Sequence, residues 1–234
     1  MRLDKLFSDA GLLSRRDCAR AASRGEITVD GKVVTRADMK VDETAAEIFF
    51  HGERVTFSKF VYVMMNKPEG YISATTDGRA PVVTELLPDE LQRRGLFPAG
   101  RLDKDTTGFM LLTDDGQTAH RLLSPKHHVE KVYAFALDAP LPLGAEERFL
   151  AGVALGDEIC KPAGLSLDEG RVSGKIVLTE GKYHQIKRMM HKEGCTVTAL
   201  RRLSFGGIPL DESLSAGEWR YLTPEETQTL LSHK

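Results

Sequence analysis

The stretch of sequence around which this chain is organised is PAGRLDKDTTGFMLLTDDG, residues 98–116. Carboxylates and hydroxyls are crowded between two glycines, and an apolar run of strand type follows at residues 109–112. A loop that a rigid element supports in this way often presents a reactive side chain. Asp and Thr are equally common in plain turns, where their side chains bond to the local backbone. The residues alone leave both interpretations open.

A calcium site is a third interpretation of the same loop. Positions one, three, five, six and twelve of the EF-hand pattern are filled by Asp103, Asp105, Thr107, Gly108 and Asp114. The last ligand should be a bidentate Glu, and the loop leads into an apolar strand rather than a helix. His184 and His191 are seven residues apart with no third ligand nearby. We therefore expect no metal in this protein.

Charge is segregated along the 234 residues. The total of 32 Lys and Arg against 34 Asp and Glu gives a net charge of −2, which argues against a surface that is basic throughout. Residues 182–202 hold six basic residues and one acidic, and residues 138–169 hold seven acidic and two basic. Local fields of opposite sign are therefore expected.

The stretch TEGKYHQIKRMMHK, residues 179–192, predicts a helix with two different faces. Helical spacing gathers His184, Lys187, Arg188 and His191 on one face, with Ile186, Met189 and Met190 opposite. A face of this kind beside Tyr183 is typical of a surface that meets phosphates and bases. A solvated face is the alternative.

The first 59 residues predict a small unit of their own. Apolar residues at helical spacing end at Gly11, Ser14 is suited to cap a second helix that stops at Gly25, and Asp30-Gly31 predicts a two-residue hairpin turn. On the second helix Arg16, Arg20 and Arg24 recur every fourth residue, as either an RNA-binding or a solvated face. Residues 52–59 are expected to be a linker.

From residue 60 onward the pattern is α+β. Strands are expected at 61–65, 109–112, 132–137 and 172–179, and helices at 116–123, 144–151, 184–193 and 224–232.

Cys18, Cys160 and Cys195 fit neither a zinc site nor a disulfide framework. No secretory signal or run of about 20 apolar residues is present, so a cytoplasmic protein without a membrane partner is expected.

Several short motifs occur in order along the chain. They are RLDK (2–5), SRR (14–16), ITVDGKVV (27–34), NKPEGY (66–71), GRLDKDTTG (100–108), SPKHHVEKVY (124–133) and GKYHQIKRM (181–189). The first three resemble the small RNA-binding domain shared with ribosomal small-subunit protein four. The others resemble bacterial ribosomal pseudouridine synthases of the RsuA type, with GRLDKDTTG the most specific match. The resemblance covers essentially the whole chain.

The resemblance implies an α+β chain of two domains. Residues 1–59 are expected to form an RNA-binding domain of two helices and a β-hairpin, like ribosomal protein four. Residues 60–234 are expected to form a pseudouridine synthase catalytic domain, with a mixed, mainly antiparallel sheet flanked by helices.

The activity implied is that of an isomerase that detaches uracil from its ribose, turns it and rejoins it through carbon. Nothing is oxidised or added, so no cofactor is expected. By resemblance Asp103 is the catalytic carboxylate and Asp105 is not, Tyr133 stacks on the flipped base, and Lys187 pairs with Asp103. Whether Asp103 attacks the sugar, attacks the base or removes a sugar proton is left open.

The resemblance also implies residues that contact the RNA. Ile186 would pack under the uracil, Arg101 would contact the backbone, and His184 shares the helix face of Lys187. Arg188 borders Lys187, so the identity of the cation beside Asp103 stays open. The small domain would bind RNA through Arg15, Arg16, Arg20, Arg24 and Lys32.

The substrate implied is 16S ribosomal RNA, with uridine 516 as the target, either naked or in a partly assembled small subunit. The double histidine His127-His128 and the motif YHQIKRM (183–189) favour the small-subunit branch of the family. A monomer is expected. The alternatives are a large-subunit uridine, or an assembly factor that binds RNA without chemistry. The intact Asp103, Tyr133 and Lys187 argue against the assembly factor.

Overall fold

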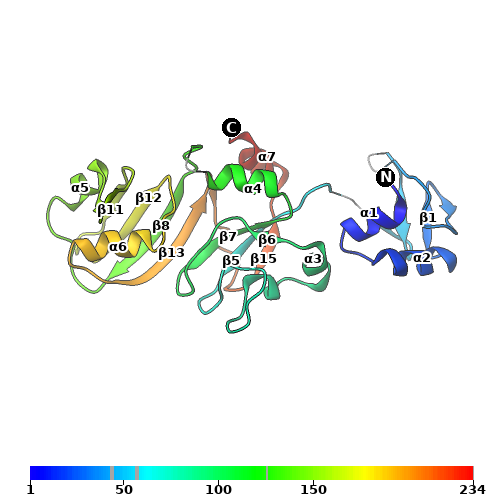
Figure 1. The fold of residues 1–234 in the computed structure, drawn as a ribbon, viewed down its shortest axis with the longest axis horizontal. Helices are drawn as coiled ribbons and strands as arrows, with labels where there is room; N and C mark the ends of the chain where they lie inside the picture. Colours follow the sequence, from blue (N-terminus) through cyan, green and yellow to red (C-terminus); the bar gives the residue numbers. More distant parts are fainter. Residues whose placement is uncertain (43–44, 56–57, 125, 234) are drawn as a thin grey trace. The chain divides into compact units, whose positions relative to one another are not determined.

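The structure of the protein, a computed structural model, describes residues 1–42, 45–55, 58–124 and 126–233. The chain forms two compact units (Figure 1). The first comprises Met1–Val61 together with Leu87–Leu96, which contains α3 (Asp89–Arg94), and the second comprises Tyr62–Leu86 and Phe97–Lys234. The domain boundary after residue 59 stays a prediction.

The two helices at the start of the first unit lie where the sequence predicts them. They are α1 (Leu3–Asp9) and α2 (Arg15–Ser23). The chain turns at Gly11, whose φ is +73°. The hydroxyl of Ser14 accepts a hydrogen bond from the backbone N–H of Asp17 at 3.1 Å, so Ser14 caps α2 as expected.

The described strands of the first unit form an antiparallel sheet in the order β2-β1-β3-β4. They are β1 (Ile27–Val29), β2 (Lys32–Val33), β3 (Ile48–Phe50) and β4 (Glu53–Val55). The predicted hairpin is confirmed, and Asp30 and Gly31 both have positive φ, as a type I′ turn requires. The prediction of a linker from residue 52 is wrong, because His51 and Gly52 make a second tight turn that pairs β4 with β3. Thr56 and Phe57 of that linker lie outside the described residues.

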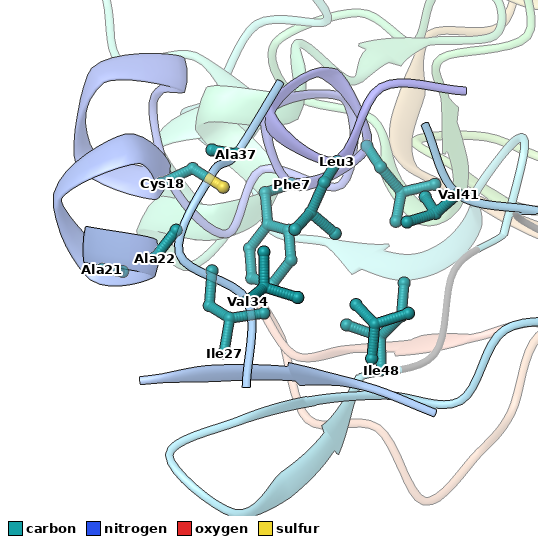
Figure 2. Packing of buried hydrophobic residues seen from close by; sticks show 12 residues of the cluster. Leu3, Phe7, Cys18, Ala21, Ala22, Ile27, Val34, Ala37, Val41 and Ile48 are labelled. Atoms are coloured by element: carbon teal, nitrogen blue, oxygen red, sulfur yellow. The ribbon is translucent and has the colours of Figure 1, made fainter. Parts of the chain in front are cut away.

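An apolar cluster joins α1 and α2 to the sheet of this unit (Figure 2). Leu3 and Phe7 of α1 are fully buried against Ile27 and Ile48 of the strands, and Cys18 of α2 is buried in the same cluster. Helices of seven and nine residues are marginal in isolation, so this packing stabilises them.

The second unit is built on a mixed, mainly antiparallel sheet in the order β11-β12-β8-β13-β7-β5-β15, with β14 beside β13 and β6 beside β7. The strands are β5 (Tyr62–Lys67), β6 (Phe97–Pro98), β7 (Thr107–Thr113), β8 (Lys131–Leu137), β11 (Gly164–Leu167), β12 (Ser173–Leu178), β13 (Val197–Phe205), β14 (Ile208–Pro209) and β15 (Trp219–Tyr221). Among the described strands, β13 and β7 pair in parallel and the other pairs are antiparallel. The predicted fold class is confirmed.

The helices of this unit agree with the predicted ranges to within a residue at each end. They are α4 (Gly116–Leu123), α5 (Ala145–Ala151), α6 (Gln185–Lys192) and α7 (Pro224–Ser232), with a 3-10 turn η1 (Val83–Leu86). Thr223 and Glu226 form a capping box at the start of α7. The helix α6 packs against β13 (Figure 1) and against β9 (Ala154–Leu155), which forms a small hairpin with β10 (Glu158–Ile159).

One row of residues crosses the sheet and joins β5, β7, β13 and β8. Lys67 pairs with Gly108, Gly108 with Arg202, and Arg202 with Tyr133. Gly108 has φ +97°, and a Cβ at this position would lie 2.3 Å from the carbonyl oxygen of Arg202. Only glycine lets β7 approach β13 this closely, at the point where the loop of Asp103 enters the sheet.

The three cysteines are buried and free of disulfides, as expected. Burial raises the pKa of the Cys18 thiol to about 11, which disfavours the reactive thiolate. No helix within the described ranges combines the length and the apolar character needed to cross a membrane.

The close approach at Gly108 leads to a prediction about stability. Gly108→Ala should lower the free energy of unfolding by about 3 kcal/mol, because the added methyl group meets backbone and the residue is strained at positive φ. Gly78→Ala is the control, since a Cβ there meets no atom within 4 Å. Urea denaturation measures both variants, and equal stabilities would contradict the prediction.

Candidate active site

The loop that carries Asp103 is fixed by hydrogen bonds on both sides of that residue. The hydroxyl of Ser73 donates to the carbonyl oxygen of Leu102 at 2.8 Å and accepts from its N–H at 2.9 Å. The N–H of Gly70 donates to the carbonyl oxygen of Lys104 at 2.9 Å. The backbone at Asp103 is therefore held against residues 70–73, which follow β5.

The buried side chain of Lys67 holds the same loop through hydrogen bonds to its backbone. Its Nζ donates to the carbonyl oxygens of Pro68, Lys104 and Thr106 at 3.0, 3.3 and 2.8 Å. The residue has no exposed surface, and burial lowers its pKa to about 8 although the charges of Asp105 and Asp103 oppose that shift. The position of the loop therefore depends on an ammonium group inside the sheet.

Asp103 meets two groups from the start of α6. Its Oδ2 lies 3.2 Å from Nζ of Lys187, and its Oδ1 lies 3.5 Å from Nε2 of His184. The side chain of Asp103 is 28% exposed, so a ligand can reach the carboxylate. The pairing expected between Asp103 and Lys187 is thus present in the structure.

Lys187 is shared between two carboxylates, which the sequence did not indicate. Its Nζ lies 2.5 Å from Oδ1 of Asp105, closer than to Asp103. The hydrogen bond from Lys187 is the main cause that lowers the pKa of Asp105. Burial alone would lower the pKa of Lys187, but its hydrogen bonds to Asp105 and Asp103 raise it. Arg188, the other candidate cation, donates instead to the carbonyl oxygen of Leu155 at 3.4 Å.

The calcium interpretation of this loop does not fit its structure. Asp103 and Asp105 face the ammonium of Lys187, and Thr107 begins strand β7 where an EF-hand would approach its second helix. Within the described residues, no group of three or more His, Cys, Asp or Glu could hold a metal ion.

The start of α6 has an unusual backbone that a buried polar contact supports. His184 has φ 47° and ψ 35°, a left-handed conformation that is uncommon outside glycine. Its ring stacks on Tyr183 with centroids 3.9 Å apart, and Tyr183 is 74% exposed. The buried amide of Gln185 donates to Glu180 at 2.7 Å and accepts from the N–H of Lys182 at 2.9 Å. These contacts set the direction in which α6 presents His184 and Lys187.

A cavity of about 390 Å³ lies over Asp103. The described residues that line it are Glu69, Gly70, Asp103, Lys104, Asp105, His184 and Lys187. Arg101 is exposed two residues before Asp103. Tyr133 and Ile186 are 8% and 4% exposed and are not among the lining residues, although Tyr133 shares the cross-strand row of Gly108. The structure therefore brings Asp103, Lys187 and His184 together and leaves Tyr133 and Ile186 buried nearby in the sheet and in α6.

The cations predicted to bind RNA in the first unit are all exposed. They are Arg15, Arg16, Arg20, Arg24 and Lys32. Arg20 pairs with Asp17 at 3.1 Å and Arg24 with Glu26 at 2.6 Å. Exposed pairs of this kind are weak, so they do not prevent contact with phosphate. Both interpretations of this arginine face are compatible with the structure.

Sequence reasoning missed two supports of the site, Lys67 and the pair Gln185–Glu180. A signal for Lys67 was available, because a lysine at the end of a largely apolar strand must find polar partners at the end of the sheet, either in the protein or in water. Glu180 carries no such signal, because its partner becomes visible only when α6 folds back onto the preceding loop.

Fold and site together are those of an RNA-modifying enzyme with a separate RNA-binding module. The family model described as RNA pseudouridylate synthase matches residues 61–192, and the S4 domain model matches residues 1–46. The chain belongs to the RNA pseudouridine synthase family, and the protein is an isomerase.

Relatives match over nearly their whole length. The chain is 44% identical to an uncharacterized RNA pseudouridine synthase, YtzG, of Bacillus subtilis, with 98% of each chain covered. It is 41% identical to the ribosomal small subunit pseudouridine synthase A of Vibrio cholerae, over 98% of this chain and 99% of the relative. A crystal structure of a pseudouridylate synthase superposes with a TM-score of 0.70 at 36% identity, covering 98% of this chain and 99% of that one.

The buried ammonium of Lys67 predicts how stability depends on pH. Its pKa is about 8 in the folded protein and 10.5 in the unfolded chain. The unfolded chain therefore binds more protons between these values, and the free energy of unfolding rises with pH there. From pH 7 to 9 wild type should gain about 1 kcal/mol relative to Lys67→Met. Urea denaturation at both pH values measures the difference. The exposed Lys175→Met serves as the control, and its stability should change with pH as that of wild type does. The prediction fails if the stability of Lys67→Met also changes with pH as that of wild type does.

Proposed function

We propose that the protein converts uridine 516 of 16S ribosomal RNA to pseudouridine. Support for the small-subunit substrate comes from relatives of about 40% identity that are named ribosomal small subunit pseudouridine synthase A, including those of Vibrio cholerae and Escherichia coli. The protein acts on naked RNA or on a partly assembled small subunit. It works as a cytoplasmic monomer without a cofactor.

The observation that carries the proposal is the contact of Asp103 with Lys187 at 3.2 Å in an open cavity. In this proposal Asp103 is the catalytic carboxylate, which acts beside the sugar and base of the flipped uridine. An ammonium group at this distance restricts the orientation of the carboxylate. Asp105 assists by holding the same ammonium.

The remaining assignments concern the flipped base and the RNA around it. A flipped base needs an apolar, water-poor surface and an aromatic ring on which to stack. Tyr133 supplies that ring and Ile186 packs under the uracil, and both are largely buried in the described structure. Arg101, Arg188 and His184 contact the RNA around the flipped nucleotide, since they lie around the mouth of the site or on the same helix.

The two domains divide the work at residue 59. Residues 1–59 bind the RNA through Arg15, Arg16, Arg20, Arg24 and Lys32, and residues 60–234 carry out the isomerisation. The match of the S4 domain model to residues 1–46 supports the first assignment. Separating the two tasks lets the small domain hold RNA without constraining the geometry at Asp103.

Asp103→Asn tests the chemistry directly. The variant should lose pseudouridine formation while its Kd for 16S RNA changes less than about twofold, because the amide keeps the size of the carboxylate but removes its charge. Pseudouridine is mapped along 16S and 23S RNA after incubation with each protein. Asp105→Asn is the matched comparison and should slow the reaction without abolishing it, since Asp103 and Lys187 are still present. A normal rate for Asp103→Asn would overturn the mechanism, and modification of 23S RNA by wild type would overturn the substrate.

Replacing Arg16, Arg20 and Arg24 together by Ala tests the RNA-binding assignment. Binding should weaken, and its dependence on salt should flatten by about one unit per lost phosphate contact. Titration of 16S RNA with the full-length variant at several salt concentrations measures both quantities. The matched control is Arg36→Ala, an exposed arginine outside the proposed binding face that pairs with Asp38. An unchanged salt slope would identify the arginine face as simply solvated.

A further inference from the structure

A groove of about 560 Å³ lies beside the cavity of Asp103, between α6, the β9–β10 hairpin and the start of β13. Five basic or histidine side chains of α6 and its N-terminal cap form one rim: His184, Lys187, Arg188, His191 and Lys192. Two further lining residues, Leu155 and Val197, are apolar and together are called the apolar floor. The volume is in the range of sites that enclose a small ligand.

The charge of this groove favours an anion. None of the described residues that line it carries a carboxylate. Glu193, which follows α6, is neutralised by Arg148, whose Nε and Nη2 lie 3.1 and 2.5 Å from its two oxygens. At the end of the groove nearest Asp103, Lys187 and His184 face the carboxylates of Asp103 and Asp105. The positive field along the rest of the rim therefore comes mainly from Arg188 and Lys192.

Two rim cations are held in place but keep free donors. Nζ of Lys192 donates to the carbonyl oxygen of Ala154 at 2.6 Å, and Nη2 of Arg188 donates to that of Leu155 at 3.4 Å. An ammonium has three N–H donors and a guanidinium has five, so each can bind a phosphate as well. Their contacts with β9 place these side chains along the rim before any ligand arrives.

The groove and the cavity of Asp103 share two residues. His184 and Lys187 line both, so a ligand that fills the groove continues directly to the carboxylate. At the junction Tyr183 is 74% exposed and stacks on His184. Exposed aromatic rings of this kind are common stacking surfaces for single-stranded nucleotides.

We propose that this groove holds the nucleotide that adjoins the target uridine in a single strand, with its phosphates on the rim of α6 and its base over the apolar floor. The proposal rests on the proposed function, and it adds the path that the RNA takes away from Asp103. The cationic rim matches the phosphates of a nucleotide, and the apolar floor and the stacking ring match its base.

The test compares two full-length proteins that differ in where a cation is removed. One carries His191→Ala with Lys192→Ala, and the control carries Lys175→Ala on the exposed side of β12. The probe is a fluorescent single-stranded fragment of 16S RNA with the uridine at its centre. The groove variant should bind it on the order of tenfold more weakly than the control, with the salt slope lowered by about 0.7 per lost phosphate contact. Urea denaturation confirms that both proteins are folded.

Truncated fragments identify the side of the uridine that occupies the groove. Two further probes end at the uridine, one on its 5′ side and one on its 3′ side. The difference between groove variant and control should disappear with one truncated probe and persist with the other. Equal affinities of the two proteins for the complete fragment, or an equal difference with both truncated probes, would overturn the groove assignment. Equal affinities for RNA would also be the result if the groove accepts an acidic protein segment instead.

Failure of the groove and failure of the proposed function are distinguishable. Phosphate contact and stacking tolerate any sequence, so the affinity comparison is repeated with an unrelated single strand of equal length and the same result is expected. Pseudouridine formation by wild type on the 16S fragment is measured separately. If wild type leaves that fragment unmodified, the 16S substrate is wrong, while the affinity difference still decides the groove.

Discussion

The constraint on which the active region depends is the burial of the Lys67 ammonium. A charge inside a protein is tolerated only when its hydrogen bonds are satisfied, and here three backbone carbonyls around the Asp103 loop accept them. The loop therefore cannot move away without leaving a charge unpaired in the sheet. Gly108 imposes a second constraint, because β7 must lie within backbone contact of Arg202. Together these two constraints fix the position of Asp103 in the loop that leads into β7.

The two sides of the site are supported in different ways. The Asp103 side is held by backbone hydrogen bonds to Lys67, Gly70 and Ser73. On the α6 side, the pair Gln185–Glu180 and the left-handed His184 set where the helix begins. Lys187 bridges the two, since its ammonium contacts both carboxylates of the loop. These contacts thus hold a carboxylate and a cation together in a partly exposed cavity.

The net charge of −2 conceals how the charge is used. The cationic face of α6 lines both the cavity and the groove, whereas the acidic segment 138–169 supplies no carboxylate to the described lining of either. Part of that segment is neutralised locally, as Glu146 shows by pairing with Arg171 at 2.9 Å. A near-neutral protein can therefore present a strongly cationic surface at one place, which suits binding that must be local and reversible.

Local patterns in the sequence predicted much of the secondary structure, because periodicity, caps and turns each act within a few residues. The helices α4, α6 and α7, the Ser14 cap and the Asp30-Gly31 turn lie where these patterns predict them. The resemblance carried by the ordered motifs was needed to single out Asp103 and Lys187, which the structure brings to 3.2 Å. Folding of the whole chain was needed for the rest. The contacts of Lys67 with Lys104 and Thr106 and the sharing of Lys187 with Asp105 join residues whose proximity follows from strand register and helix docking. Such contacts are non-local, so no pattern of neighbouring residues contains them.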